Sequence, residues 1–467
     1  MRKHLFYLLL FSTLFTQAQI TPEIEWSKTL GSTSMDVGRG VVQTSDGGYI
    51  AFGQVMMGDA DVTNFKGGVD YWIAKTSVTG ELEWEKTYGG SLLDFGGDDQ
   101  ILKIRQTQDG GYILGGTSNS DDGDVTHNYG MEDIWLVKID SSGNIQWEKN
   151  YGGSGEDVFR DIQPTDDGGY ILTGRTTSSD GDINSEYIEL GAYTTAWVAK
   201  LDDSGNIEWS NDIGGYDTFF NEFFSIYPVS DGYVATGSSD GVGGDIPSDG
   251  RGSSDFWVVK MDISGQVVWS KLYGGPSMDQ PSSIRPADDG GYVVAGYVSQ
   301  LGGDVTESYG GQDIWILKLN NDGNLEWQKS IGGSRGEGIQ EIQTTLDGGY
   351  VVGGYTLSTD GHFEENASKG EQDKFLLKIN STGDIVWTKT FGGSSHDILW
   401  GFEITSEGGF ITIGSTNSID GDLVGKENND FDYWIVKLSP DCLVPELTID
   451  TTHTICVGEE LTLTADA

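Results

Sequence analysis

Closely spaced aspartates recur in a series of short loops and are the side chains of this sequence best suited to bind a metal. The loops read S-x-D-G-D or a near variant, and their carboxylates are Asp59, Asp61, Asp122, Asp124, Asp180, Asp182, Asp240, Asp245, Asp304, Asp360, Asp420 and Asp422. Ca²⁺ prefers oxygen ligands on flexible loops, which these aspartates could supply. The spacing of the aspartates is not that of an EF-hand. Two interpretations therefore stay open: solvated acidic turns, or calcium in at least one loop, with Asp122, Asp124, Asp180, Asp182, Asp420 and Asp422 as the first ligands to test.

Aromatic residues gather in the irregular copies of the same loops and of the bends that follow. They are Tyr187, Tyr193, Tyr216, Phe219 and Phe220, together with His396 and Trp400 in a later bend. Exposed aromatic side chains favour contact with sugars or proteins. A crevice between structural units that these rings simply fill is the competing interpretation.

Catalytic motifs are sparse. Three histidines outside the two ends of the chain, His127, His362 and His396, share no motif, and no G-x-S-x-G, H-E-x-x-H or P-loop pattern occurs. Paired carboxylates could still act as a general acid and base. We therefore expect a binding protein more than an enzyme, with a carboxylate-dependent polysaccharide hydrolase or lyase as the alternative.

A repeat of about sixty residues must position these loops. Its first tryptophan falls at Trp26, Trp84, Trp147, Trp209, Trp269, Trp327 and Trp387, spacings of 58 to 63 residues. Every apolar run within a copy is short, rich in Val, Ile, Tyr and Trp, and closed by Gly, Asp or Ser, which is typical of strands. In the third copy we expect strands over 160–165, 170–176, 196–202 and 206–211. Four antiparallel strands in each of seven copies predict a seven-bladed β-propeller.

The two ends of the repeat region complement each other. The chain enters with a lone W-x-K strand at 23–29 and leaves with a D-x-W-x-x-K strand at 432–438. The N-terminal strand should therefore be the outer strand of the last blade, with Trp26 beside Trp434, because an unpaired strand edge would otherwise remain. In such a meander the tight D-G-G and S-G-N turns share one face. The acidic loops and the G-G-S bends share the other, where we expect binding.

Residues that recur in nearly every copy are expected to be structural. The lysine of the W-x-x-K strand should lie along an apolar wall or pair with carboxylates, the recurrent aspartates should cap turns, and the tryptophans should pack between blades. The lysines are Lys75, Lys138, Lys200, Lys260, Lys318, Lys378 and Lys437.

The copies resemble kelch-type and SBBP-type propeller repeats. G-G-Y-I-L-T-G at 168–174 occupies the place of the second kelch strand, and I-Q-W-E-K at 145–149 that of the closing tryptophan strand. The resemblance covers about 23–438 and implies a propeller fold. With an N-terminal leader and a module-like tail, the chain also resembles surface proteins exported by type IX secretion systems.

Composition and the chain ends set the remaining expectations. The net charge of −46 disfavours nucleic acid and anionic membranes as partners, and no apolar segment after the leader is long enough to span a bilayer. Residues 1–18 resemble a signal peptide, 19–439 the propeller, and 440–467 a linker and the first strands of an Ig-like or PKD-type module with further domains beyond. Pairing of Cys442 with Cys456 or with another cysteine stays open. The expected protein is a secreted or cell-surface binding or adhesion propeller for a glycan or protein, with a structural spacer as a further alternative.

Overall fold

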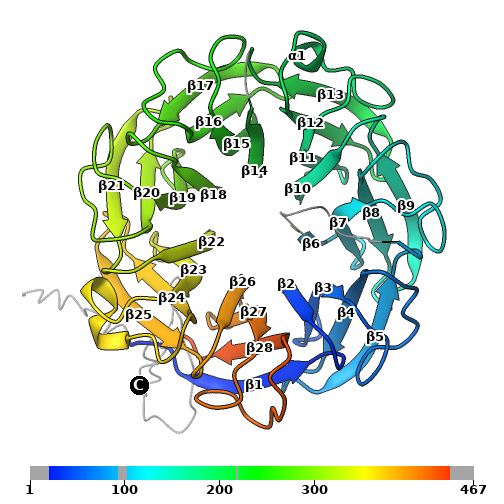
Figure 1. Ribbon diagram of the computed structural model, residues 1–467, viewed down its shortest axis with the longest axis vertical. Coiled ribbons are helices and arrows are strands. Elements are labelled where there is room, and N and C mark those ends of the chain that lie inside the picture. Colours follow the sequence, from blue (N-terminus) through cyan, green and yellow to red (C-terminus); the bar gives the residue numbers. More distant parts are fainter. Residues whose placement is uncertain (1–19, 93–102, 217–218, 442–467) are drawn as a thin grey trace, which may run out of the picture.

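Seven four-stranded antiparallel sheets form a closed ring around a central axis in the computed structural model, which describes residues 20–92, 103–216 and 219–441 (Figure 1). The sequence-based prediction of a seven-bladed β-propeller is confirmed. The expected signal peptide, the Ig-like tail and both cysteines lie outside the described residues.

In six of the seven blades the strands run from the axis outward in chain order, and in the last blade β1 (Ile24–Leu30) is the outermost strand. The innermost strands are β2 (Asp36–Gln43), β6 (Lys103–Gln106), β10 (Asp157–Pro164), β14 (Asn221–Val229), β18 (Gln280–Pro286), β22 (Glu337–Thr344) and β26 (Asp397–Ile404). The second strands are β3 (Tyr49–Val55), β7 (Tyr112–Ser118), β11 (Tyr170–Thr176), β15 (Gly232–Ser239), β19 (Tyr292–Val298), β23 (Tyr350–Thr356) and β27 (Phe410–Thr416).

The outer half of each blade completes the sheet. The third strands are β4 (Asp70–Thr76), β8 (Asp133–Ile139), β12 (Thr195–Leu201), β16 (Asp255–Met261), β20 (Asp313–Leu319), β24 (Asp373–Ile379) and β28 (Asp432–Leu438). The outermost strands are β5 (Leu82–Tyr88), β9 (Ile145–Tyr151), β13 (Ile207–Ile213), β17 (Val267–Tyr273), β21 (Leu325–Ile331), β25 (Ile385–Phe391) and β1 (Ile24–Leu30). In the third blade these limits match the predicted strands to within about three residues.

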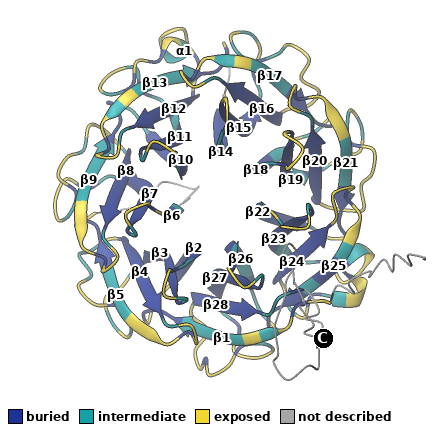
Figure 2. Cartoon of the chain, turned by 180° about the vertical axis from the view of Figure 1, so that it is seen from behind, coloured by how far each residue is buried: buried dark blue, intermediate teal, exposed yellow. Residues whose placement is uncertain are grey.

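The hydrophobic core lies between neighbouring blades. Third strands such as β8 and β20 are buried at all seven positions because both faces of the sheet are covered, whereas the outermost strand β9 is exposed or half-buried at six of its seven positions (Figure 2). The third-strand tryptophans carry the contact across the junction: the rings of Tyr71 and Trp135 lie 4.8 Å apart, as do those of Tyr433 and Trp72. The prediction that the tryptophans pack between blades is confirmed.

The ring closes through β1, which pairs with β28 in the sheet that also holds β26 and β27 (Figure 1). The prediction that Trp26 lies beside Trp434 is wrong, because Trp26 is opposite Lys437 and Trp434 is opposite Thr29. Both tryptophans are the third residue of their strands, so antiparallel pairing sends them to opposite ends of the ladder. Trp26 packs instead on Tyr49 of the first blade, at 5.7 Å between ring centroids.

The turns separate two faces of the ring as the repeat predicts. The tight turns between first and second strands use a glycine with positive φ, such as Gly168 at 88°, and those between third and fourth strands do the same, such as Gly205 at 76°. The long acidic loops and the G-G-S bends occupy the opposite, loop-rich face. Two short helical segments interrupt these loops, α1 (Glu186–Glu189) and η1 (Gly361–Asn366). Neither they nor any other described helix combines the length and apolar character needed to cross a membrane.

Candidate functional site

The first aspartate of each acidic loop holds the bend that precedes its own blade. Asp122 accepts a hydrogen bond from the backbone N–H of Ser91 at 2.6 Å, and Asp180 and Asp420 accept from Ser154 and Ser394, each at 2.7 Å. A carboxylate bonded in this way satisfies a backbone donor that the bend leaves unpaired. The first aspartate of these loops therefore has a local structural role.

The second aspartate of the loop binds the neighbouring blade. Asp124 pairs with Lys66 at 2.5 Å and Asp422 with Lys369 at 2.5 Å, while Tyr129 donates a hydrogen bond to Asp182. Each contact joins consecutive acidic loops around the rim. Within 20–92, 103–216 and 219–441, no three His, Cys, Asp or Glu side chains gather as a group that could hold a metal. Calcium in these loops stays a prediction.

Buried carboxylates meet at the junctions between blades. The residue that opens a third strand, such as Asp133, lies near the bend carboxylate that opens the next inner strand, such as Asp157, and both are fully buried. Burial raises the pKa of Asp133 to about 7, and the neighbouring Asp157 adds to the shift. Related pairs are Asp36 with Asp432, Asp255 with Asp279, Asp313 with Glu337, and Asp373 with Asp397. Where Thr195 replaces the first aspartate of a pair, Asn221 replaces the second.

An exposed apolar surface lies on the loop-rich face where the third blade meets the fourth. It is formed by Tyr193, Tyr216, Phe219, Phe220 and Val242, with exposed fractions between 43% and 70%, and we call it the aromatic patch. The rings of Tyr193 and Phe219 stack at 5.4 Å, and Tyr216 forms an isolated bridge with Val242. Both Phe219 and Phe220 donate backbone hydrogen bonds to Asp240 at 3.0 Å. Loops distant in sequence thus present one surface.

Tyr187 supports this surface from α1. Its ring lies 5.5 Å from that of Tyr216, and its hydroxyl donates a 2.9 Å hydrogen bond to Asp245. Ser185 caps the helix by accepting from the backbone N–H of Ile188. The structure thus brings together five of the seven residues singled out for binding.

The other two, His396 and Trp400, lie elsewhere. The His396 ring contacts Glu371 at 2.6 Å and Gln372 at 3.0 Å. Trp400 is within β26 and not in the bend, at a bulge that follows Leu399, and the Arg39 guanidinium lies 4.1 Å from its ring centroid. Neither residue contributes to the aromatic patch.

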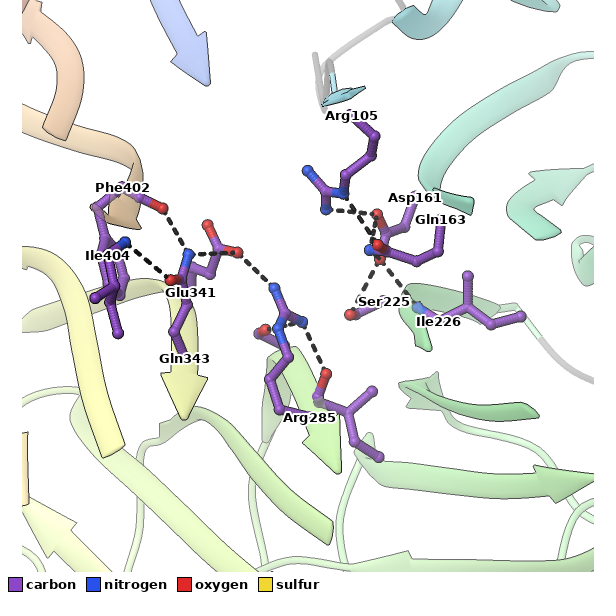
Figure 3. A network of polar contacts seen from close by, with 12 residues as sticks. Arg105, Asp161, Gln163, Ser225, Ile226, Arg285, Glu341, Gln343, Phe402 and Ile404 are labelled. Carbon is purple, nitrogen blue, oxygen red and sulfur yellow. Dashed lines mark hydrogen bonds and ion pairs between the residues drawn. The ribbon is translucent and has the colours of Figure 1, made fainter. Parts of the chain in front are cut away.

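Two groups of polar contacts, which we together call the belt, link neighbouring inner strands near the axis (Figure 3). Arg105 on β6 reaches Asp161 at 3.3 Å and Gln163 at 3.1 Å on β10. On the other side, Arg285 on β18 pairs with Glu341 on β22 at 2.5 Å. Further contacts run from Asp161 to Ser225 and Ile226, from Gln343 to Phe402 and Ile404, and from Glu403 to the backbone N–H of Gln43.

The belt surrounds a cavity of about 300 Å³, which we call the axial cavity. Among the described residues, the charged side chains that line it are Arg39, Lys103, Arg105, Arg285, Glu341 and Glu403, four cations against two carboxylates. This balance reverses that of the whole chain, which has 73 acidic and 27 basic residues. Sequence reasoning missed these residues, although four of the eight arginines fall in the inner strand of the repeat, and that concentration is a usable signal.

The axial cavity shifts the pKa values of its carboxylates in opposite directions. Burial raises the pKa of Glu403 to about 7, because the backbone hydrogen bond from Gln43 offsets only part of the lost hydration. Burial also acts on Glu341, but Arg285, Lys103 and Arg105 together hold the pKa of that carboxyl below its usual value. Burial lowers the pKa of Lys103. Glu341 therefore stays ionised while Glu403 titrates near neutrality.

Comparison with known proteins gives distant likenesses. No family model matches the chain. Over 293 residues, 56% of this chain, it is 25% identical to regulatory protein FlaEY of Caulobacter vibrioides, and the match spans 30% of the length of that protein. Two solved proteins of unknown function are similar. One from Dyadobacter fermentans has 14% identity and a TM-score of 0.42, covering 76% of this chain and 97% of its own. One from Bacteroides caccae has 12% identity and a TM-score of 0.37, covering 74% and 98%.

Proposed function

We propose that this chain is a secreted or cell-surface, non-catalytic binding propeller whose loop-rich face recognises a protein or a glycan through the aromatic patch. The observation that carries the proposal is the patch itself, where Tyr193 is 70% exposed, Phe219 64% and Phe220 49%. Adjoining apolar side chains exposed to this degree are typical of contact surfaces.

A protein partner with a basic rim suits the chemistry of the patch best. Aromatic side chains are enriched at protein interfaces, and the aliphatic side chain of Val242 adds apolar area that a sugar would not need. The acidic residues Glu186 and Glu189 on α1 and Asp240 beside Phe219 would attract basic side chains. A glycan stacked on Tyr193 or Phe219 is the second kind of ligand to test.

The experiment compares the full chain with a Tyr193→Ser/Phe219→Ser variant on arrays of extracellular proteins and of glycans. Residues at the centre of an interface commonly contribute 2 kcal/mol or more, so the variant should lose roughly thirtyfold in affinity. The matched control is Ile263→Ser, which changes an apolar side chain that is 72% exposed in a turn on the opposite face.

Ile263→Ser should bind as the unaltered chain does, because the two faces are on opposite sides of the ring. Full binding by the patch variant to a ligand that the unaltered chain captures would contradict the proposal. Failure of the unaltered chain to bind any protein or glycan would favour the structural-spacer alternative.

A carboxylate-dependent hydrolase or lyase is the second candidate, and one observation favours it. Glu341 and Glu403 line the same cavity with pKa values displaced in opposite directions, as in acid and base pairs of glycosidases. Turnover of a polysaccharide by the unaltered chain, and its loss in Glu403→Gln, would support catalysis. Absence of turnover from a bound polysaccharide would oppose it.

Calcium ordering of the acidic loops is part of the proposal. A ligand that binds only the folded state raises the unfolding temperature, and the stabilisation grows with the logarithm of the ligand excess over its dissociation constant. We expect the unfolding temperature to rise in millimolar Ca²⁺ relative to EDTA, and the rise to be smaller in Asp180→Asn. An unfolding temperature that is identical in Ca²⁺, Mg²⁺ and EDTA would contradict a calcium site.

A further inference from the structure

We propose that the axial cavity binds a small hydroxylated carboxylate, the chemical class that includes sugar acids. This site is separate from the aromatic patch, since it is formed by the inner strands and not by the long loops. Three features favour this ligand class: the sign of charge in the cavity, a lysine without a direct ion pair among the described residues, and polar side chains in the wall without hydrogen bonds to described residues.

The charge of the cavity is the first argument. Among the described residues, four cations and two carboxylates line it, and each carboxylate already has a partner: Glu341 pairs with Arg285, and Glu403 accepts from the N–H of Gln43. The surplus of positive charge lies inside a molecule of net charge −46. A partly enclosed wall strengthens the attraction of such a surplus for an anion.

Lys103 is the second argument. Its side chain lines the cavity at the start of β6 and makes no hydrogen bond or ion pair to any residue in the described ranges, although the charges of Glu341 and Asp161 act on it. Arg105 and Arg285, in contrast, are engaged in the belt. Glu341 and Asp161 are engaged by Arg285 and Arg105, so Lys103 lacks a direct ion pair among the described residues, and a ligand carboxylate would supply one.

Polar groups in the wall supply the third argument and narrow the ligand class. Gln106, Tyr227 and Thr344 line the cavity, and none of their side chains is hydrogen-bonded to another described residue. An amide, a phenol and an alcohol can exchange hydrogen bonds with the hydroxyls of a ligand. Phe402 adds an apolar surface, and a cavity of about 300 Å³ accommodates one monosaccharide-sized molecule.

Substitution of Glu403 should change the affinity for an anion in the opposite direction to substitution of Lys103. At about pH 8 its carboxyl is mostly ionised and would repel an incoming anion, because its pKa is about 7. The charged groups that face it are Arg105 and Glu341, and the nearby phenols of Tyr49 and Tyr112 are neutral at this pH. Removing the Glu403 charge should therefore strengthen anion binding under conditions in which removing Lys103 weakens it.

The experiment is titration calorimetry of the full chain with D-glucuronate at about pH 8, with D-glucose as the uncharged analogue and inorganic phosphate as an anion without hydroxylated carbon. Lys103→Met should lower the affinity for glucuronate about tenfold, and Glu403→Gln should raise it. The control Lys329→Met removes a partly exposed lysine from outer strand β21 and should leave the affinity unchanged.

Three results would overturn the inference. The first is no binding of millimolar glucuronate to the unaltered chain. The second is equal binding of glucose or phosphate, which would remove the hydroxylated carboxylate as the ligand class. The third is an equal loss of glucuronate affinity in Lys103→Met and Lys329→Met, which would show that only the net charge of the chain matters. None depends on the aromatic patch, so the Tyr193→Ser/Phe219→Ser variant should retain glucuronate binding.

Discussion

Buried lysines in the third strands show how single residues connect the turns of a blade. Lys138 is 4% exposed and pairs with Asp109 of the D-G-G turn at 2.8 Å, and Lys200 pairs with Asp167 at 2.9 Å. The pairing helps to lower the pKa of both aspartates to about 2, since it and the turn hydrogen bonds outweigh the effect of burial. The prediction of a structural role for these lysines is confirmed. Their ion pairs connect the third strands to the tight turns.

One buried ion pair offers a test at the scale of single residues. Arg160 on β10 is fully buried and donates to Glu222 on β14 through Nε at 3.0 Å and Nη2 at 2.6 Å. Arg160→Met should lower the free energy of unfolding by about 3–5 kcal/mol because Glu222 would remain as an unpaired buried charge. Denaturant titration measures the change.

Two further variants separate this cause from loss of packing. Arg160→Met/Glu222→Leu should recover most of the stability, since no buried charge remains. Arg335→Met, at an exposed arginine, should change stability by no more than about 0.5 kcal/mol. If Arg160→Met were as stable as the unaltered chain, the ion pair of Arg160 with Glu222 would contribute nothing to stability.

At the scale of elements, β1 makes the ring a closed structure. It supplies the outer strand of a blade whose other three strands come from the far end of the chain, with paired residues from Ile24 opposite Leu438 to Leu30 opposite Tyr433. Backbone contacts continue past the strands, where Ser439 donates to Glu23 at 2.9 Å. Without β1, the edge of β28 would expose its hydrogen-bonding groups.

Removing β1 should therefore destabilise the whole ring. We expect the chain beginning at residue 31 to associate or aggregate through the free edge of β28, and a synthetic peptide of residues 20–30 to restore the monomer. Size-exclusion chromatography with light scattering measures this. A scrambled peptide is the control, and a monomeric truncated chain with an unchanged unfolding temperature would contradict the role given to β1.

For the molecule as a whole, the carboxylate pairs at the blade junctions set the dependence of stability on pH. Burial raises the pKa of Asp36 and Asp133 to about 7 and of Asp279 and Asp373 to about 6, above the usual aspartate value of 3.8. Between these values the folded state holds protons that the unfolded state has released. Stability from these groups is thus complete below about pH 4 and is lost as pH rises to about 7.

We expect the free energy of unfolding to be larger near pH 5 than near pH 8, by on the order of a few kcal/mol over all junctions. Denaturant titrations at constant high salt measure this with surface repulsion screened. Asp133→Asn, which copies the neutral Thr195 and Asn221 junction, should flatten the slope, whereas Asp203→Asn in an exposed turn should not. Stability that rises from pH 5 to pH 8 would contradict the assignment.

The ring was predictable from the sequence because strand period, turn glycines and tryptophan spacing repeat seven times and reinforce one another. The strand register was harder to predict. Trp26 and Trp434 occupy the same position in their strands, which suggested that they lie side by side, but antiparallel pairing places them apart. The grouping of Tyr193 with Phe219 follows from loop-rich-face topology, but the placement of Trp400 depends on a bulge that sequence patterns do not reveal. The axial cavity escaped prediction because its charged residues come from several blades, one or two from each.

The antiparallel pairing of β1 with β28 also determines how the ring would respond to tension. Ile20 contacts Asp441, and Glu23 contacts Ser439. The start of β1 and the end of β28 therefore lie at the same end of the strand pair. A pull between residues 20 and 441 would load the backbone hydrogen bonds one after another, as in peeling. If this propeller were anchored at both ends between two surfaces, it would open at this line under small forces, while the remaining six blades kept all four strands.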